Sequence, residues 1–503
     1  MTLPKSEQIP LRAGPLSLVY EAGDLRYIRL GDREILRRVY VAVRDQNWDT
    51  VPATLANEQL TIAADSFQIS YDAQHAVGGI DFFWRGTISG NAQGTIVFAM
   101  DGAARSTFLR NRIGFCVLHP IHECAGQPCR VEQADGRSVA GTFPLYVAPH
   151  QPFRSMRSIS HEVMPGTYAK VRFAGDVFEM EDQRNWTDAS YKTYCTPLEL
   201  PFPIEVRAGT TIAQAVTLTL HGAPLAVGTE PEPLRITRTG DRARRLPRLG
   251  LGLAGHDQPL SAVEAARLRG LQLAHLRTDL HLARPEYPEM LQQGTTAARV
   301  LGTELEIALF LSDAAKTELD RLALQLEQIQ PPVCTWLVFH ENEKATSARW
   351  VELARAYLHG YAPASKVGGG TNAYFAELNR ARASVEAAEL VSYSINPQVH
   401  AFDNGSLVEA LAAQAATVVS ARQFCGERPI AVSPITLKPR RLRHCANNLS
   451  HALRPSPSLK PSICLACRCH GHRVGRVGHC ASAVPKWCCP SHCGTLSRPC
   501  LPC

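Results

Sequence analysis

Polar and apolar residues alternate along the first 225 residues, in short runs separated by turn-forming residues. The segment 16–45 contains several such runs, with turns expected at 22–24 and 31–32, and further runs occupy 67–73, 79–89, 94–100 and 112–121. The segment 202–222 predicts a hairpin around Ala208 and Gly209. Alternation with period two is typical of half-buried strands. Residues 1–225 therefore predict a β-sandwich domain.

The segment 226–247 contains three prolines and a dense cluster of charges, which is typical of a linker. After it the rhythm changes to short apolar strands followed by amphipathic helices. Strands are expected at 249–255, 274–280, 304–311, 335–343, 365–374, 390–398 and 429–439, and helices at 261–272 (capped by Ser261), 290–302, 313–329, 347–360, 381–389 and 406–426. The three glycines 368–370 are expected to form a flexible loop.

About seven β-then-α units over residues 248–438 predict an incomplete (β/α)8 TIM-type barrel. The alternative is an open doubly wound sheet. The barrel is favoured because no strand–helix junction carries the GxGxxG fingerprint of dinucleotide-binding sheets.

The tail, residues 439–503, has a different composition. It holds ten of the 16 cysteines and ten Lys or Arg residues, but no Asp or Glu. It has no hydrophobic periodicity, which favours a disordered segment produced by a frameshift near codons 438–441. The alternative is a zinc module, because CxxC pairs lie near histidines, although their spacing matches no familiar zinc ligand set.

Without the tail, the chain has 43 basic and 46 acidic residues and six scattered cysteines. This composition is typical of a reduced cytosolic protein, and the basic charge of the whole chain is no argument for nucleic-acid binding. No run of 18 apolar residues occurs, and the N-terminus lacks the pattern of a signal peptide. We therefore expect a cytoplasmic protein with no membrane or nucleic-acid partner; the oligomeric state is not predicted.

Charged and aromatic residues are interleaved in the segment 175–195, GDVFEMEDQRNWTDASYKTYC. Together with 110–120 (RNRIGFCVLHP), 143–153 (FPLYVAPHQPF) and the continuation to Pro203, it resembles the D-apionate lactonase family of bacterial sugar-acid catabolism. The similarity runs from about Leu16 to Pro439. It implies hydrolysis of D-apionolactone to D-apionate in apiose catabolism, a β domain, a glycosidase-like barrel and a further C-terminal β segment. The chain departs from that pattern after Pro439.

Hydrolysis of a lactone requires a base to activate water, donors for the oxyanion and an acid for the leaving alkoxide. The segment supplies candidates for each role, and its aromatic side chains could pack against sugar rings. Glu179 and Glu181 are expected to share one face of a strand, where two like charges raise one pKa. Asp182 is a third candidate base. Arg184, Asn185 and Trp186, with the strand-end histidines His119 and His150, are candidates for substrate binding.

In barrels of this type the active site lies at the carboxyl ends of the strands. Candidate residues at these ends are Asp279, His340, Glu341, Asn372, Asn396, His400 and Lys438. Glu341 follows the fourth strand, where retaining glycosidases of similar barrels have one of two catalytic carboxylates. The seventh strand offers Lys438 and no carboxylate, which favours a lactonase over a glycosidase. No GxSxG motif occurs, so a serine nucleophile is not expected.

These observations predict a carboxylic ester hydrolase whose partner is a small sugar lactone and which needs no organic cofactor. Glu179, Glu181 or Asp182 would be the base, Glu341 or His340 the acid, and Lys438 or Arg184 the oxyanion donor. Participation of a metal is left open. The alternatives are a TIM-barrel glycoside hydrolase acting on plant sugars and a non-catalytic carbohydrate-binding protein. Each candidate side chain also has a structural interpretation: a neutralised loop charge, a satisfied core histidine or a polar residue at the barrel mouth.

Overall fold

A computed structural model describes residues 7–222, 246–253, 258–382, 384–437 and 463–465. The predicted linker lies largely outside these ranges. So does the Cys-rich tail, apart from the backbone of residues 463–465, and with it the frameshift and zinc interpretations. Within the described residues, no helix is long and apolar enough to cross a membrane.

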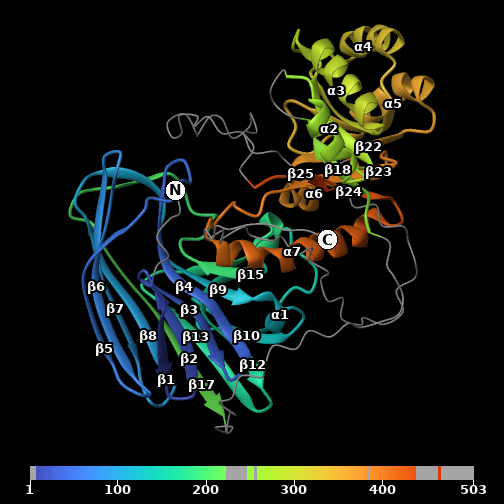
Figure 1. Cartoon of the computed structure of the whole chain (residues 1–503). Coiled ribbons are helices and arrows are strands. Elements are labelled where there is room, and N and C mark those ends of the chain that lie inside the picture. Colours follow the sequence, from blue (N-terminus) through green and yellow to red (C-terminus); the bar gives the residue numbers. More distant parts are fainter. Residues whose placement is uncertain (1–6, 223–245, 254–257, 383, 438–462, 466–503) are drawn as a thin grey trace, which may run out of the picture. The chain divides into compact units, whose positions relative to one another are not determined.

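Residues 7–222 form one antiparallel sheet (Figure 1). Its strands are β1 (Ile9–Ala13), β2 (Leu16–Glu21), β3 (Asp24–Leu30), β4 (Arg33–Asp45), β5 (Thr54–Ile62), β6 (Phe67–Val77), β7 (Ile80–Gly90), β8 (Ile96–Ala104), β9 (Phe108–Pro120), β10 (Pro128–Gln133), β11 (Ser138–Thr142), β12 (Phe153–Met164), β13 (Thr167–Ala174), β14 (Phe178–Asp182), β15 (Ser190–Tyr194), β16 (Ile204–Val206) and β17 (Thr211–Gly222). Two short helices, α1 (Ile121–Cys124) and η1 (Gln183–Trp186), interrupt them.

Hydrogen bonds connect the strands in the order β1, β2, β3, β4, β9, β15, β14, β12, β13, β17, β8, β7, β6 and β5. The ends of this order approach each other, because the Gly14 amide in the β1–β2 turn donates to the Asp65 carbonyl in the β5–β6 turn at 2.8 Å. The sheet is therefore a nearly closed barrel. The two separate sheets of the predicted sandwich are not observed, since strand pairing continues around the whole domain.

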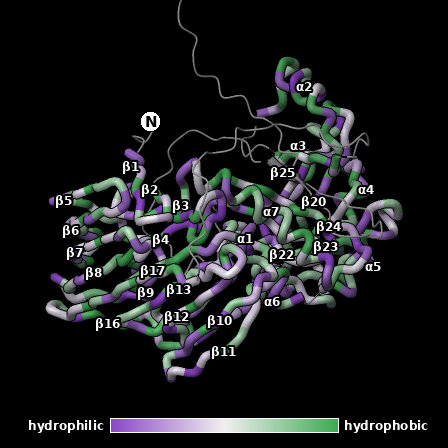
Figure 2. Tube along the Cα trace, turned by 90° about the horizontal axis from the view of Figure 1, so that it is seen from below, coloured by the Kyte–Doolittle hydropathy of each residue, from purple (hydrophilic) through white to green (hydrophobic). Residues whose placement is uncertain are grey.

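The alternating pattern of the sequence explains why this sheet folds. In β2 every second residue is buried, and β6 and β8 follow the same rule. Figure 2 shows hydrophobic and hydrophilic residues alternating along these strands. The buried residues, among them Ile69, Phe98 and Phe115, join one large apolar core. Removal of this apolar surface from water is the main term that stabilises the domain.

The second region is an α/β barrel with seven parallel strands. Its elements are β18 (Leu249–Gly252), α2 (Ala262–Arg269), β19 (His275–His281), α3 (Tyr287–Leu301), β20 (Glu304–Leu311), α4 (Ala315–Ile329), β21 (Val333–His340), α5 (Ala348–Tyr361), β22 (Lys366–Tyr374), α6 (Phe375–Ala381), β23 (Leu390–Ile395), α7 (Asn404–Cys425) and β24 (Ile430–Ile435). A short tail strand, β25 (Ile463–Leu465), pairs antiparallel with β18 and β24 and closes the ring.

The predicted parallel barrel is confirmed in its seven strands, and the predicted cap is present, since Ser261 Oγ accepts a hydrogen bond from the Glu264 amide. Two local predictions are wrong. The fifth helix of the barrel, α6, occupies Phe375–Ala381 rather than 381–389. The glycines 368–370 lie buried inside β22 rather than in a flexible loop, and a Cβ on Gly368 would lie 2.0 Å from a methyl carbon of Leu390.

Alternation along the barrel strands decides which side chains reach the lumen. In β20, Ile307 and Leu309 pack against the outer helices, whereas Ala308 and Phe310 join a cluster with inward residues of other strands. Within β20, the residues of the same parity as Phe310 therefore face the lumen, and in each other strand the alternation is read from its own residues in the two clusters. The carboxyl ends of all seven parallel strands lie at one end of this lumen, which is where the candidate site is built.

Candidate active site

A histidine–carboxylate pair lies at the carboxyl end of the barrel. His281 is the last residue of β19, and Glu341 directly follows β21. His281 Nδ1 lies 3.1 Å from Glu341 Oε1. Their side chains are 26 % and 16 % exposed, so a ligand can reach both. Glu341, predicted as a site residue, therefore has a partner, His281, that was not predicted from the sequence.

The surroundings of His281 favour the neutral imidazole. Its ring stacks on Phe310, with centroids 4.1 Å apart and planes 14° apart. Burial lowers the pKa of His281 below its ordinary value, although the hydrogen bond with Glu341 raises it in part. When Nδ1–H donates to Glu341, the lone pair of Nε2 is directed away from the carboxylate and is able to accept a proton.

An arginine deeper in the lumen holds the two other candidate residues of this region. Arg277 is 3 % exposed. Its Nε donates to Asp279 Oδ1 at 2.8 Å and its Nη2 to Asn372 Oδ1 at 2.9 Å. The Nη1 group donates to Ser433 Oγ at 2.8 Å, and Ser433 in turn donates to Glu306. This network fixes the positions of Asp279 and Asn372 below the His281–Glu341 pair.

His340, predicted as an alternative acid, does not face the lumen. It has the same parity as Trp336 and Val338, which pack against the outer helices. Its ring stacks on Trp350 of α5 with centroids 4.4 Å apart and planes 6° apart. The side chain is 2 % exposed, and its Nε2 lies 3.4 Å from Asp313 Oδ1. This position supports a structural role at the helix layer, because alternation turns His340 away from Glu341.

Asp182 and Arg184 form a buried ion pair with each other. Arg184 Nε donates to Asp182 Oδ1 at 2.9 Å and Arg184 Nη2 to Asp182 Oδ2 at 2.7 Å. Asp182 also accepts from the amide of Ala148, and Arg184 donates to the carbonyls of Pro144 and Leu145. The two side chains are 0 % and 2 % exposed. A base and an oxyanion donor must meet the substrate, so this pair instead anchors the segment 144–148.

Glu179 and Glu181 share one face of β14, as predicted, but each has a separate partner. Glu179 is buried and accepts from Tyr194 Oη at 2.6 Å and from the Leu198 amide at 2.7 Å. Glu181 forms an ion pair with Lys192. Burial raises the pKa of Glu181, but the charges of Lys192 and His400 outweigh it, so the net pKa lies below the usual value. The expected raised pKa is therefore wrong for Glu181, because a cation compensates its charge.

The two strand-end histidines are not brought together in one site. His119 is fully buried, its Nε2 lies 3.1 Å from Thr193 Oγ1, and burial lowers its pKa to about 3. His150 is exposed. The environment of His119 supports a core histidine, one of the two interpretations that the sequence allowed.

The residues around η1 contact the loops and helices of the barrel. Asn185 donates to the Ala148 carbonyl and accepts from Asn379 of α6. Trp186 meets the ring of His400 edge-on, with centroids 5.7 Å apart. The carbonyl of Asn396, which is itself buried, accepts from the Thr187 hydroxyl at 3.2 Å. His400 Nδ1 lies 2.5 Å from Asp188 Oδ2. The charged segment of the β domain thus borders the loop that follows β23.

Lys438, the predicted oxyanion donor, lies outside the described residues. Four residues of the site were not predicted from the sequence: His281, Arg277, Glu306 and Ser433. For His281 and Arg277, the signal in the sequence was their spacing. Each lies two residues from Asp279 in the strand His275–His281, so all three side chains share one face. Among the described residues, no group of three or more His, Cys, Asp or Glu side chains could hold a metal ion.

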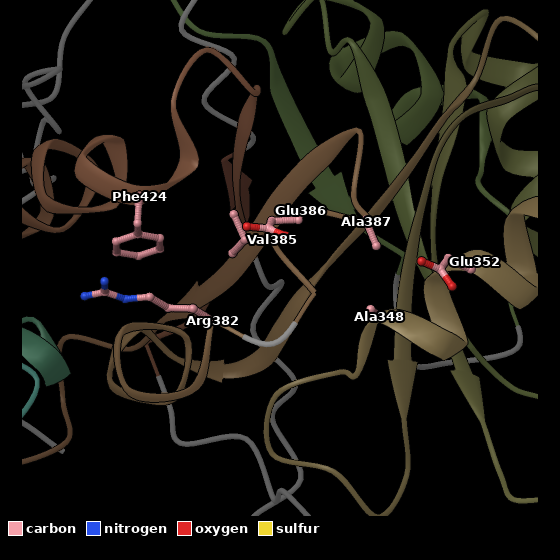
Figure 3. A pocket seen from close by; sticks show the side chains of 7 residues that line it. All are labelled: Ala348, Glu352, Arg382, Val385, Glu386, Ala387 and Phe424. Carbon is pink, nitrogen blue, oxygen red and sulfur yellow. The ribbon is translucent and has the colours of Figure 1, made fainter.

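A hollow of about 540 Å³ lies elsewhere on the barrel. It is lined by Ala348, Glu352, Arg382, Val385, Glu386, Ala387 and Phe424. Figure 3 shows Arg382 extended beside the Phe424 ring, which its guanidinium carbon approaches to 4.2 Å from the centroid. None of the site residues predicted from the sequence lines this hollow.

Comparison with known proteins places both regions in one family. Residues 1–223 match the model of the D-apionate lactonase N-terminal domain, and residues 249–448 match that of the D-apionate lactonase TIM barrel domain. The chain belongs to the D-apionate lactonase family. It is 32 % identical over 460 residues to the D-apionate lactonase of Brucella anthropi, covering 85 % of this chain and 72 % of that protein.

Solved structures give weaker likenesses. A β-arabinopyranosidase aligns with 77 % of this chain and 67 % of its own at 9 % identity and a TM-score of 0.30. Galactose 1-epimerase from Lactobacillus acidophilus aligns with 44 % of this chain and all of its own at 5 % identity and a TM-score of 0.26. These scores are too low to carry an argument about function, which rests instead on the family and on the geometry of the site.

Proposed function

We propose that this member of the D-apionate lactonase family hydrolyses D-apionolactone to D-apionate, with His281 as the general base. The observation that carries the proposal is the His281–Glu341 pair at the barrel mouth, 3.1 Å apart and open to a ligand. Family membership supports the substrate, since the relative in Brucella anthropi is a D-apionate lactonase.

Glu341 and His281 have different roles in activating water. Glu341 accepts the Nδ1–H of His281 and so fixes the tautomer and the orientation of the ring. Nε2 removes a proton from a water molecule as its oxygen attacks the lactone carbonyl, and the carbonyl electrons move onto oxygen. The neighbouring Phe310 excludes water from one face of the ring and keeps the imidazole neutral before the reaction.

Arg277 supports this site through its partners rather than through its own contact with substrate. It holds Asp279 and Asn372 at fixed positions beneath the pair. An amide and a carboxylate at such positions can bind the hydroxyl groups of a sugar lactone, and positioning of a substrate contributes to rate by reducing the entropy lost in the transition state. Lys438, three residues beyond the end of the seventh strand in the sequence, remains a candidate oxyanion donor.

A glycosidase is the weaker alternative. Retaining enzymes need a second carboxylate about 5 Å from the first, usually beyond strand seven in such barrels. The segment that follows β24, Thr436 and Leu437, has no carboxylate, and the next residue is Lys438. The observed partner of Glu341 is a histidine, which suits the activation of water at an ester carbonyl.

The test is a pH-stat assay of acid release from D-apionolactone, with an aryl glycoside as the control substrate. We expect acid release by the wild-type chain, and loss of it in His281→Asn. Turnover of the aryl glycoside would favour the glycosidase, and saturable sugar binding without acid release would favour a non-catalytic binding protein. Acid release that His281→Asn leaves unchanged would contradict the proposed base while keeping the function.

A further inference from the structure

The loop between β19 and α3 carries an arginine next to the proposed base. The Arg284 amide donates to the His281 carbonyl at 2.9 Å. A hydrogen bond from the fourth residue back to the first closes a β-turn, in which the two Cα atoms lie within about 7 Å of each other. Since His281 is the last residue of β19, this turn holds Arg284 at the barrel mouth, close to the histidine.

The backbone on both sides of Arg284 is restrained. Leu282 is 1 % exposed and belongs to the apolar core of the barrel, and its amide donates to the Phe310 carbonyl at 3.0 Å. Pro285 follows Arg284, and the ring of a proline disfavours the helical conformation for the residue before it. The position of Arg284 is therefore set by the fold before any ligand arrives.

The side chain of Arg284 is exposed, and its nitrogen atoms are available to a ligand. In the part of the chain that the structure describes, its guanidinium has no hydrogen-bond or ion-pair partner. Arg277, by contrast, uses its nitrogen atoms on Asp279, Asn372 and Ser433. Of these two arginines, Arg284 is the one that can bind a substrate directly.

The charge of Arg284 acts on the imidazole of His281. Burial is the largest cause that lowers the pKa of His281; the hydrogen bond with Glu341 raises it in part, and the cation of Arg284 lowers it further. The charge of Asp279 raises it. Exposed charges act on one another mainly over short distances, because water and salt screen them. The guanidinium therefore lies near the ring whose Nε2 activates water.

We propose that Arg284 binds the carbonyl oxygen of the lactone and stabilises the negative charge that develops on it when water attacks. The inference rests on the proposed function and deepens it by naming the oxyanion donor. The sequence suggested Lys438 or Arg184 for this role. A planar guanidinium presents several N–H donors in a fixed geometry, which suits an oxyanion and afterwards a carboxylate.

Arg284 donates hydrogen bonds during the reaction and transfers no proton. The water oxygen forms a bond to the carbonyl carbon, His281 Nε2 takes a proton from the water, and the π electron pair of the carbonyl moves onto the oxygen bound by Arg284. When the carbonyl forms again, the bond to the ring oxygen breaks and its electron pair goes to that oxygen. The His281 imidazolium gives the ring oxygen its proton, and the product acid loses its own proton to solvent.

The variant Arg284→Met removes the donors and keeps a long side chain. At a pH well above the acid limb, where His281 is neutral in every variant, we expect kcat on D-apionolactone to fall by about 10²- to 10³-fold, the loss caused by removing one oxyanion donor. KM should change much less, because the oxyanion exists only beyond the ground state. Lys344→Met removes an exposed cation from the loop after β21; it is the matched control and leaves kcat unchanged.

Two further measurements separate binding of the oxyanion from an electrostatic effect on His281. Guanidinium ions at low concentration should restore part of kcat in Arg284→Met and leave the wild type unchanged. The acid limb of kcat/KM should move to higher pH in Arg284→Met, because the cation no longer lowers the pKa of His281, and it should move less in Arg284→Lys. Circular dichroism and a thermal melt of each variant check that the fold is retained.

The results distinguish the inference from the proposed function. A moved acid limb with unchanged kcat above it would show that Arg284 only tunes His281, and would overturn the oxyanion role while the lactonase function stands. An equal loss of kcat in Lys344→Met would overturn it as well. Absence of wild-type turnover would refute the proposed function and the inference with it. Loss of kcat above the acid limb, restored in part by guanidinium ions, is the result that supports the inference.

Discussion

The guanidinium of Arg184 binds the carboxylate of Asp182 through two nitrogens, at 2.9 and 2.7 Å, in the interior of the protein. This relationship connects η1 to the carbonyls of the segment 144–148, which Arg184 also binds. Removal of one partner of such a buried ion pair strongly destabilises the folded protein, because the other partner is left as an uncompensated buried charge.

We therefore expect Arg184→Met to lower the free energy of unfolding by about 3–5 kcal/mol, since Asp182 would remain buried without its cation. Urea denaturation at neutral pH measures the change. The matched control is Arg137→Met, which breaks the exposed pair of Arg137 and Asp135, 75 % and 50 % exposed. That change is expected to have a much smaller effect, because solvent screens an exposed ion pair. Equal effects of the two substitutions would contradict the structural role of Arg184.

The buried histidines predict a loss of stability in acid. Burial lowers the pKa of His119 to about 3 and that of His161 to about 4. The unfolded chain has histidine pKa values of about 6.5, so it binds more protons than the folded chain as the pH falls below that value. Their contribution to stability is present above about pH 6.5 and is lost progressively between there and the folded pKa.

The variant His119→Gln removes one of these groups. Between pH 6 and pH 4.5 we expect the free energy of unfolding to decrease by about 1.4 kcal/mol less per pH unit in the variant than in the wild type. Urea unfolding at several pH values measures this slope, and His150→Gln, at an exposed position, is the control. An unchanged slope in His119→Gln would show that His119 does not remain neutral in the folded protein.

The His281–Glu341 pair predicts a pH profile. The general base acts when neutral, and burial lowers the pKa of His281, so the acid limb of kcat/KM for D-apionolactone should lie below the ordinary histidine value of about 6.5. Glu341→Gln removes the charge that partly raises this pKa, so the limb should move to lower pH still. The same variant should lose about 10²- to 10⁴-fold in kcat, because the amide no longer fixes the tautomer. A limb that moves to higher pH would contradict the assignment.

The hydrogen bonds of Arg277 predict that activity depends on the shape of this side chain as well as on its charge. Lys in its place is a point charge and cannot bind Asp279, Asn372 and Ser433 at the same time. We expect Arg277→Lys to lower kcat/KM for D-apionolactone by at least about tenfold through misplacement of Asp279 and Asn372. Steady-state kinetics measure the loss, and Arg12→Lys on the exposed face of β1 is the control. Unchanged kcat/KM would separate this network from the site.

The sequence by itself determined which segments form strands and helices, through the periodic spacing of their hydrophobic residues. Alternation with period two in segments such as 67–73 predicted the strands of the first domain, and the β-then-α rhythm after residue 248 predicted the parallel barrel. Both patterns are local, because burial of one strand face or one helix stripe is encoded by neighbouring residues. The same logic placed Glu341 beyond the fourth strand and Asp279 and Asn372 at strand ends, and the stretches 110–120, 143–153 and 175–203 identified the family.

Only the tertiary structure decided how those side chains are paired. Sequence composition could not separate Asp182 and Arg184, which neutralise each other inside the protein, from Glu341, which remains open at the barrel mouth. His281 and Glu341 are sixty residues apart, and Asp188 and His400 more than two hundred, so their contacts depend on strand order and closure of the ring. Alternation turned His340 outward and His281 inward. The function of a charged side chain is set by its burial and its partners, and long-range packing fixes both.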